Sequence, residues 1–250
     1  MKVLVIDVGG TYIKLGTGAP DESKKIRSGQ DMTAERMAQE VKQATAGWAY
    51  DVVTIGYPGP VVNGRPAVEP RNLGAGWVGF DYEKAFGRPV RLINDAAMQA
   101  LGSYEGGRML FLGLGTGLGS ALVANGQLEP LELAHLPYRR NRTFEDYLGA
   151  RGIKRMGRKR WQRHVEKVVE ILKHGLQADY VMLGGGQTKK LKRLPDGLRL
   201  GDNLCAIPGG IRLWEATISE CIDPSAARQP VPPGAAAPSP ALRDRRSSQG

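Results

Sequence analysis

The sequence predicts an α/β protein built from two similar lobes. An apolar strand that ends in a glycine turn occurs in each half, as Leu-Val-Ile-Asp-Val-Gly-Gly-Thr at residues 4–11 and as Leu-Phe-Leu-Gly-Leu-Gly-Thr at residues 110–116. A second strand-like run follows each turn, and two glycines at 106–107 separate the halves. A repeat of this kind indicates two copies of one structural unit. We therefore expect one lobe over residues 1–105 and the other over 106–216.

The composition narrows the class of protein. With 250 residues and 41% hydrophobic content, the chain can bury a core for two modest domains. No run approaches the roughly 18 apolar residues that a membrane span needs. Met1 and Lys2 lead directly into a strand rather than into a signal peptide. We therefore expect a cytoplasmic protein without a membrane partner.

Basic residues outnumber acidic ones, with 35 Lys and Arg against 25 Asp and Glu and a formal net charge of +10. Such a surface attracts polyanions through long-range electrostatics. Charge alone does not distinguish nucleic acid, a polyphosphate chain and a nucleotide. A basic face that is merely solvated has the same composition.

The first half alternates strands and helices after its opening strand. Apolar residues at helical spacing predict an amphipathic helix over 32–48, and a β-branched run predicts a strand over 51–57. A short strand over 89–93 is followed directly by Asn94-Asp95 and then by a helix over 96–101. This junction places polar groups at a strand end.

The second half begins with a strand over 108–114. A stripe of apolar residues predicts one long helix over 153–177, and we interpret the stripe as core. A strand over 179–183 leads to three glycines and to the start of another helix at 189–194. Residues 217–250 are rich in Pro, Ala, Ser and Arg without periodicity, so we expect a disordered tail there.

Glycine turns end three of the predicted strands: Gly9-Gly10-Thr11, Gly115-Thr116-Gly117 and Gly184-Gly185-Gly186. Glycine lets backbone amides approach a phosphate closely, and Thr hydroxyls add donors. Each turn alone is also typical of a plain tight turn, but three of them converging on one cleft predict a phosphate site. The spacing matches neither a P-loop nor a Rossmann fingerprint, because Leu118 replaces its third glycine. Lys14, beyond the first turn, reaches a phosphate or points to solvent.

Four motifs together resemble the ROK sugar kinases: Asp7-Val-Gly-Gly-Thr-Tyr-Ile-Lys14, Asn94-Asp95, Gly115-Thr116-Gly117 and Glu132-Leu-Ala-His135. The resemblance covers residues 1 to about 215. Segments 56–62, 132–137, 142–147 and 200–203 are similar to the polyphosphate glucokinase branch of that family. The resemblance implies an actin-like, ribonuclease-H-like sugar kinase fold with a cleft between the lobes.

The resemblance also implies roles for single residues. It makes Asp95 the general base for the sugar hydroxyl, and a carboxylate at a strand end in a cleft suits that chemistry. An Asp here also serves as a helix N-cap. The positions that match sugar contacts in the family are Asn94, Glu132, His135 and Glu145. Amide and carboxylate groups suit the hydroxyls of a sugar, whereas the ordinary alternative for His135 is a packed loop histidine.

Phosphoryl transfer needs a cation, so we expect Mg²⁺, held chiefly by donor phosphates with Asp7 as its protein neighbour. Many ROK proteins carry a cysteine-rich zinc motif after the histidine. This chain has Tyr-Arg-Arg-Asn-Arg at 138–142, so we expect no structural zinc. We expect His164 and His174 to be ordinary surface residues.

The reaction predicted from the resemblance is phosphoryl transfer from polyphosphate to the 6-hydroxyl of glucose. Basic stretches at 139–142, 154–160 and 189–193 favour polyphosphate, while an ATP-dependent hexose kinase is the alternative. The family includes sugar-responsive repressors, so the alternative of another class is a DNA- or polyanion-binding protein without catalysis. Since the first strand begins at residue 2 or 3, we expect no helix-turn-helix and no specific nucleic acid. The family relationship also predicts a homodimer.

Overall fold

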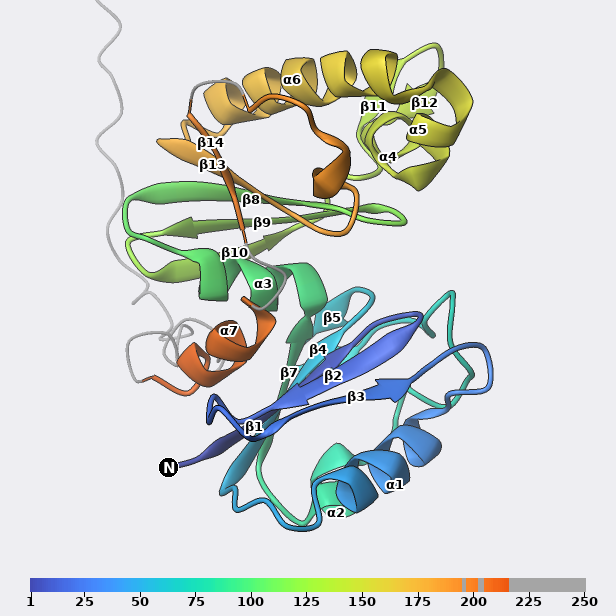
Figure 1. Ribbon diagram of the computed structural model, residues 1–250, viewed down its shortest axis with the longest axis vertical. Helices are drawn as coiled ribbons and strands as arrows, with labels where there is room; N and C mark the ends of the chain where they lie inside the picture. Colours follow the sequence, from blue (N-terminus) through green and yellow to red (C-terminus); the bar gives the residue numbers. More distant parts are fainter. Residues whose placement is uncertain (195–196, 202–204, 216–250) are drawn as a thin grey trace, which may run out of the picture.

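The computed structural model describes residues 1–194, 197–201 and 205–215. The tail predicted over 217–250 lies outside these residues. Two five-stranded sheets are stacked, with helices between them and on both outer sides (Figure 1). This arrangement confirms the predicted two-lobed α/β fold.

The first sheet has the strand order β3-β2-β1-β4-β7. Its strands are β1 (Val3–Val8), β2 (Tyr12–Gly16), β3 (Ser23–Arg27), β4 (Val52–Tyr57) and β7 (Val90–Asn94). Strand β1 pairs antiparallel with β2 and parallel with β4, which pairs parallel with β7. All six residues of β1 are buried, because other layers cover both faces of the sheet.

The second sheet repeats this order as β10-β9-β8-β13-β14. Its strands are β8 (Arg108–Leu114), β9 (Leu118–Ala124), β10 (Gln127–Leu131), β13 (Tyr180–Gly184) and β14 (Leu198–Leu200). Strand β8 takes the place of β1, since it pairs antiparallel with β9 and parallel with β13. Two short hairpins complete the strands: β5 (Val61–Val62) with β6 (Arg65–Pro66), and β11 (Pro137–Arg139) with β12 (Arg142–Thr143).

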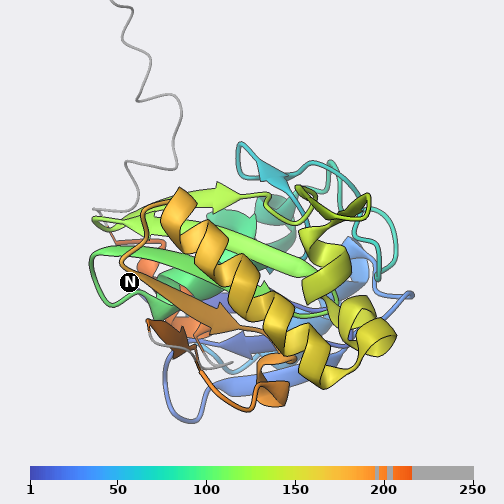
Figure 2. The same cartoon turned by 90° about the horizontal axis from the view of Figure 1, so that it is seen from above.

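Helices cover the outer faces of both sheets. The first sheet is covered by α1 (Ala34–Ala44) and α2 (Tyr82–Phe86), and the second by α4 (Phe144–Leu148), α5 (Ala150–Met156) and α6 (Arg158–Gly175). Helix α6 runs diagonally across the second sheet (Figure 2). Its buried residues include Trp161, Val165 and Val168, so the interpretation of the apolar stripe as core is confirmed.

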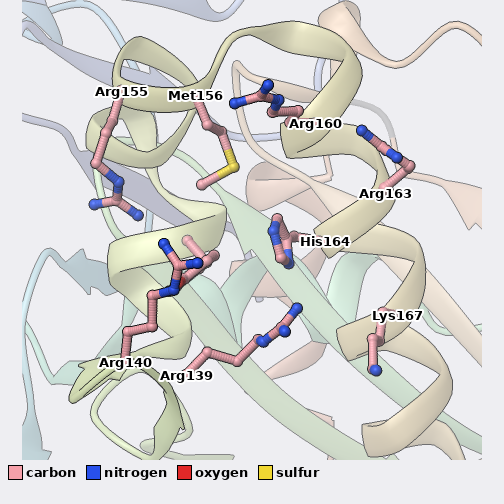
Figure 3. A pocket seen from close by; sticks show the side chains of 9 residues that line it. Arg139, Arg140, Arg155, Met156, Arg160, Arg163, His164 and Lys167 are labelled. Carbon is pink, nitrogen blue, oxygen red and sulfur yellow. The ribbon is translucent and has the colours of Figure 1, made fainter.

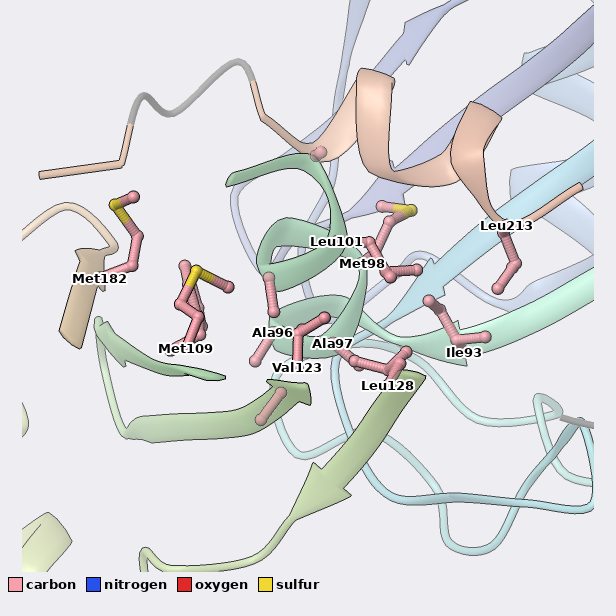
Figure 4. Close-up of a cluster of buried hydrophobic side chains, with 14 of the residues drawn as sticks. Ile93, Ala96, Ala97, Met98, Leu101, Met109, Val123, Leu128, Met182 and Leu213 are labelled. Carbon is pink, nitrogen blue, oxygen red and sulfur yellow. The ribbon is translucent and has the colours of Figure 1, made fainter. Parts of the chain in front are cut away.

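A central layer joins the two sheets. It consists of α3 (Asp95–Ser103) and α7 (Ala206–Arg212), whose apolar residues share one core cluster with both sheets (Figure 4). The two helices touch through backbone: a β-carbon at Gly102 would lie 1.7 Å from the Cys205 carbonyl oxygen, and one at Gly209 1.8 Å from that of Met98. Helix α7 follows the second sheet in sequence but packs against β1, where Gly210 meets Val5. The lobe boundary at 105/106 therefore stays a prediction.

Some predicted elements differ from the structure. The prediction of a single helix over 153–177 is wrong, because Gly157 adopts φ 76° and divides this region into α5 and α6. The helix predicted over 32–48 is shorter, since Thr33 caps α1 and the chain leaves the helix after Ala44. Only a 3₁₀ turn, η1 (Thr188–Lys190), forms where another helix was expected. Among the described residues, no helix combines the length and apolar character needed to cross a membrane.

Candidate active site

The candidate site lies where parallel strands of both sheets end. In the first sheet Asp7 of β1 pairs with Gly56 of β4, and β7 ends one strand farther at Asn94. In the second sheet Gly113 of β8 pairs with Gly184 of β13. Ligands of open α/β sheets bind outside these carboxyl ends. The predicted site residues therefore form two groups, one at the edge of each sheet.

The N-terminus of α3 connects the two groups. Its first residue is Asp95, and a β-carbon built on Gly56 of the first sheet would lie 3.7 Å from the Asp95 Cα. The next residue, Ala96, faces the second sheet: a β-carbon built on Gly119 of β9 would lie 2.6 Å from the Ala96 Cβ. Asp95 therefore lies between the strand ends of the two sheets.

Asn94 and Asp95 have different structural roles. Asn94 is the N-cap of α3, because its Oδ1 accepts hydrogen bonds from the amides of Ala96 at 2.9 Å and Ala97 at 3.2 Å. Its Nδ2 donates to the Gly59 carbonyl at 3.0 Å. The N-cap role considered for Asp95 therefore belongs to Asn94. One Nδ2 hydrogen of Asn94 remains for the predicted sugar contact.

The environment of Asp95 raises the proton affinity of its carboxyl group. Burial raises the pKa of Asp95 from 3.8 to about 7, and the negative charge of Asp7 adds to the rise. A hydrogen bond from the Ala96 amide at 2.8 Å and the charge of Lys14 oppose it. A carboxyl with a pKa near neutrality can both accept and release a proton under physiological conditions.

Asp7 and Lys14 form an ion pair at the end of β1. The two residues are directly opposite each other in the β1–β2 register, and Lys14 Nζ lies 2.9 Å from Asp7 Oδ2. The Lys14 ammonium thus contacts Asp7 while part of its side chain stays exposed, and Asp7 is only 5% exposed. An oxygen donor such as Asp7 suits Mg²⁺, but among the described residues no three acidic, His or Cys side chains gather to hold an ion. A Mg²⁺ ion beside Asp7 would therefore take most of its oxygens from groups other than acidic side chains, such as waters or a ligand.

The first glycine turn closes tightly on itself. The Gly9 amide donates to the Tyr12 carbonyl at 3.1 Å, and a β-carbon at Gly9 would lie 2.8 Å from that oxygen. Gly10 and Thr11 are exposed at the tip, where Gly10 lies against Asn72. The exposed part of the turn is therefore the part open to an anion.

The other two turns lie side by side in the second lobe. The Gly115 amide donates to the Gly117 carbonyl at 3.1 Å, while the Gly115 and Thr116 carbonyls accept from the Ala150 amide at 3.1 and 3.2 Å. Gly185 has φ 85°, and a β-carbon there would lie 2.4 Å from the Leu114 carbonyl oxygen. The remaining predicted residue, Gly184, packs its backbone on the ring of Phe111. Close packing thus accounts for glycine at 184 and 185, and phosphate binding by the three turns stays a prediction.

The structure brings three predicted sugar-contact residues close together. Glu145, 18% exposed at the start of α4, accepts from the Leu118 amide at 3.4 Å and pairs with Arg151 at 3.1 Å. Its backbone amide donates to the Ala134 carbonyl at 3.0 Å, which places it beside the segment that carries Glu132 and His135. Both of these residues are exposed. Glu145 therefore links this segment to the Gly115-Thr116-Gly117 turn.

Three residues without a functional role predicted from the sequence lie near the candidate site or on the basic surface. Asn72 faces the first glycine turn from a long loop that carries no periodic signal. Gln187 directly follows the three glycines, and its buried Oε1 has no hydrogen-bond partner among the described residues. His164, expected at the surface, is half-buried, and its Nδ1 lies 3.1 Å from the Tyr138 hydroxyl. The position of Gln187 after a strand-end glycine run was the one available signal.

Comparisons with known proteins agree with this geometry. A polyphosphate glucokinase of Mycobacterium tuberculosis is 27% identical over 210 residues, which cover 74% of this chain and 77% of that protein. The crystal structure of an inorganic polyphosphate/ATP-glucomannokinase from Arthrobacter sp. strain KM matches with a TM-score of 0.71 at 25% identity, over 84% of this chain and 96% of that one. A ROK family glucokinase from Streptomyces griseus, solved with glucose and AMPPNP, shares the fold at 16% identity, with a TM-score of 0.69 and coverage of 85% and 99%.

The family comparison identifies the part of the chain that carries the site. Residues 3–130 match the ROK family, which is just over half of the chain. The matched part includes the first two glycine turns and the Asn94-Asp95 junction at the start of α3. Because the family match covers more than half of the chain, the chain belongs to the ROK family.

Proposed function

We propose that this protein is a kinase that transfers a phosphoryl group from inorganic polyphosphate to the 6-hydroxyl of glucose, with Asp95 as the general base. The observation that carries the proposal is the position of Asp95 between the strand ends of the two sheets, with a pKa of about 7. A base with this pKa is ionised in part of the molecules at neutral pH and can take the proton of a sugar hydroxyl.

The sugar side of the site consists of Asn94, Glu132, His135 and Glu145. Glu145 is held by the Leu118 amide and by Arg151, so its carboxylate is already oriented before a sugar binds. Directed acceptors of this kind fix a ring of hydroxyls in one orientation. In our proposal they turn the 6-hydroxyl of glucose toward Asp95.

The donor side consists of the three glycine turns and Lys14. The sugar oxygen attacks the terminal phosphorus, the bond from that phosphorus to the bridging oxygen breaks, and Asp95 takes the hydroxyl proton. Glucose 6-phosphate and a polyphosphate shorter by one phosphate result. When bound beside Asp7, Mg²⁺ would neutralise charge on the donor oxygens.

Two observations favour polyphosphate over ATP as the donor. The relative from Mycobacterium tuberculosis is named polyphosphate glucokinase, whereas the Arthrobacter protein is named for both donors and does not distinguish them. The basic stretches at 139–142, 154–160 and 189–193 of the second lobe also favour a long polyanion, because their attraction grows with the number of charges on the ligand.

The test is to measure hexose phosphorylation with each donor separately, with Mg²⁺ and after its removal by chelation. We expect glucose 6-phosphate from polyphosphate and Mg²⁺, and little product without the metal. Product with ATP alone would mean that the chain is an ATP-dependent hexose kinase. No product from any hexose with either donor would favour a sugar- or polyanion-binding protein without catalysis.

We also propose that the enzyme works in the cytoplasm as a homodimer without a specific nucleic-acid partner. The family relationship supports the dimer. Light scattering of the full chain should give twice the monomer mass of 27.0 kDa. A monomer mass at micromolar concentration would overturn the dimer.

A further inference from the structure

A second basic site lies on the outer side of the second lobe. A cavity of about 470 Å³ opens between the β11–β12 hairpin, α4, α5 and α6. Six cationic side chains line it: Arg139, Arg140, Arg155, Arg160, Arg163 and Lys167. Figure 3 shows that these side chains come from the hairpin, from α5 and from α6 and that they surround one space. We call this cavity the arginine pocket.

The local backbone explains why cations from three segments meet there. Gly157 ends α5 and starts α6, so the two helices do not continue in line and Arg155 and Arg160 reach the same cavity. Along α6 the spacing of Arg160, Arg163 and Lys167 keeps them on one face, while the buried stripe occupies another. Arg140 lies at the tip of the hairpin in a left-handed conformation, φ 50°.

The positive charge of the arginine pocket is not balanced by neighbouring acids. Among the described residues, none of its six cations forms an ion pair. Arg155 donates to the backbone carbonyl of Asp146 at 2.8 Å, and the Asp146 carboxylate is engaged by Thr143 in a capping box. The Glu166 carboxylate of α6 accepts from Gln162 at 2.9 Å.

His164, at the wall of the arginine pocket, responds to this charge. Burial lowers the pKa of His164, and the nearby Arg139, Arg163, Lys167 and Arg155 lower it further. The ring therefore takes up a proton only at a lower pH than an ordinary imidazole. The neighbouring cations disfavour the protonated form of this half-buried imidazole. An anion bound among them would reduce that repulsion.

We propose that the arginine pocket binds a distal section of a polyphosphate chain while the end of the same chain reacts in the cleft. Guanidinium groups pair with phosphate oxygens through two parallel hydrogen bonds, which suits a chain that carries a charge on every phosphate. This inference rests on the proposed function, because it gives polyphosphate a second contact with the enzyme.

Helix α5 connects the candidate active site with the arginine pocket. The Ala150 amide, at the start of α5, bonds the Gly115 and Thr116 carbonyls of the candidate active site, and Met156, at the other end, lines the arginine pocket. A helix rises about 1.5 Å per residue, so these ends are about 9 Å apart. A polyphosphate chain that contacts both sites therefore has only a short helix to pass.

The lining also favours polyphosphate over a nucleic acid. Single-stranded nucleic acids need exposed aromatic rings on which their bases stack. Of the two rings that line the arginine pocket, Tyr147 is 8% exposed with the Arg155 guanidinium 5.0 Å from its ring centre, and His164 is half-buried. The pocket thus offers much charge and little exposed ring surface for stacking.

The decisive variant is Arg160→Gln with Arg163→Gln, compared with Lys154→Gln plus Lys159→Gln. Both pairs remove two charges from exposed positions on α5 or α6, but only the first pair lines the cavity. We expect the first pair to raise the KM for long-chain polyphosphate about tenfold, as for a loss of about 1.4 kcal/mol. Its kcat and its KM for tripolyphosphate should stay within about twofold, as should all constants of the control pair. Equal effects of both pairs, or none, would overturn the proposal.

A binding measurement separates this proposal from the donor assignment. In the full chain carrying Asp95→Asn, long-chain polyphosphate should raise the pKa of His164, followed by its ring proton signals in NMR, and tripolyphosphate should not. A shift in this variant, combined with no polyphosphate-dependent kinase activity of the wild-type enzyme, would support the arginine pocket and reject the donor. Kinase activity with polyphosphate and no shift would reject the pocket and keep the donor. Single-stranded DNA that displaces polyphosphate at equal phosphate concentration would also reject it.

Discussion

Asn94 and Asp95 show how two adjacent polar residues divide structural and chemical work. Asn94 caps α3 and holds the Gly59 carbonyl, so its side chain fixes the junction between β7 and the helix. Asp95 is thereby held at the N-terminus of α3, close enough to Asp7 for the two charges to interact. A rigid junction of this kind keeps a base in one position relative to the substrate.

Asp95→Asn tests the base directly. The variant keeps the shape of the side chain but cannot take a proton, so kcat should fall by about 10²–10⁴-fold while glucose binding persists. In the wild type, kcat/KM should rise with pH and level off above about 7, as the Asp95 carboxyl ionises. Initial rates across the pH range check both, with the exposed Asp21→Asn as the control. A variant with wild-type turnover would assign the base to another residue.

The same carboxyl affects stability with a predictable sign. Because the pKa of Asp95 is raised from 3.8 to about 7 in the folded state, the folded protein holds the proton more tightly than the unfolded chain. Ionisation therefore lowers the free energy of unfolding as pH rises from about 4 to 7, by at most about 4 kcal/mol. The free energy of unfolding of Asp95→Asn, relative to that of the wild type, should therefore be higher at pH 8 than at pH 5. Urea unfolding at the two pH values measures the change, and a constant difference would contradict it.

At the scale of elements, the division between α5 and α6 is the main departure from the sequence-based expectation. The apolar stripe of α6 keeps helical spacing, and a glycine within such a pattern is compatible with a continuous helix. The break depends on the φ of Gly157, which the pattern of side chains does not encode. The strand-turn pairs, in contrast, could be predicted because apolar runs and glycine turns are local signals.

Gly157→Ala tests whether the break is required. At Gly157 the backbone has φ 76° and ψ 160°, a region that only glycine populates readily. We expect alanine to lower the free energy of unfolding by about 1–3 kcal/mol. In a continuous helix the same change would stabilise by about 1 kcal/mol. Gly175→Ala at the end of α6, where nothing lies within 4 Å of the built β-carbon, is the control, and urea unfolding of both variants gives the sign.

At the scale of the whole molecule, the central layer unites the two sheets. Helix α7 comes late in the chain but packs against β1, and its backbone touches α3. Its short length and two glycines gave no sign of this position, because the contacts that place it come from residues more than a hundred positions away. The arginine pocket escaped prediction for the same reason, although its basic stretches were recognised.

Gly209→Ala tests the contact between α3 and α7. The added β-carbon would lie 1.8 Å from the Met98 carbonyl oxygen, so the two backbones must separate. We expect the free energy of unfolding to fall by about 3 kcal/mol. Gly47→Ala, whose built β-carbon has nothing within 4 Å, should change it by less than about 0.5 kcal/mol. Equal stability of the two variants in urea unfolding would show that the helices can move apart freely.

The identical strand order gives the two sheets an internal correspondence, in which β1 and β8 hold the same central place. Asp7, paired with Gly56, then occupies the same position in its sheet as Gly113, paired with Gly184, in the other. One of these equivalent positions carries a carboxylate and the other has no side chain. The two halves therefore match in backbone arrangement but differ in chemistry at the strand ends that form the candidate site.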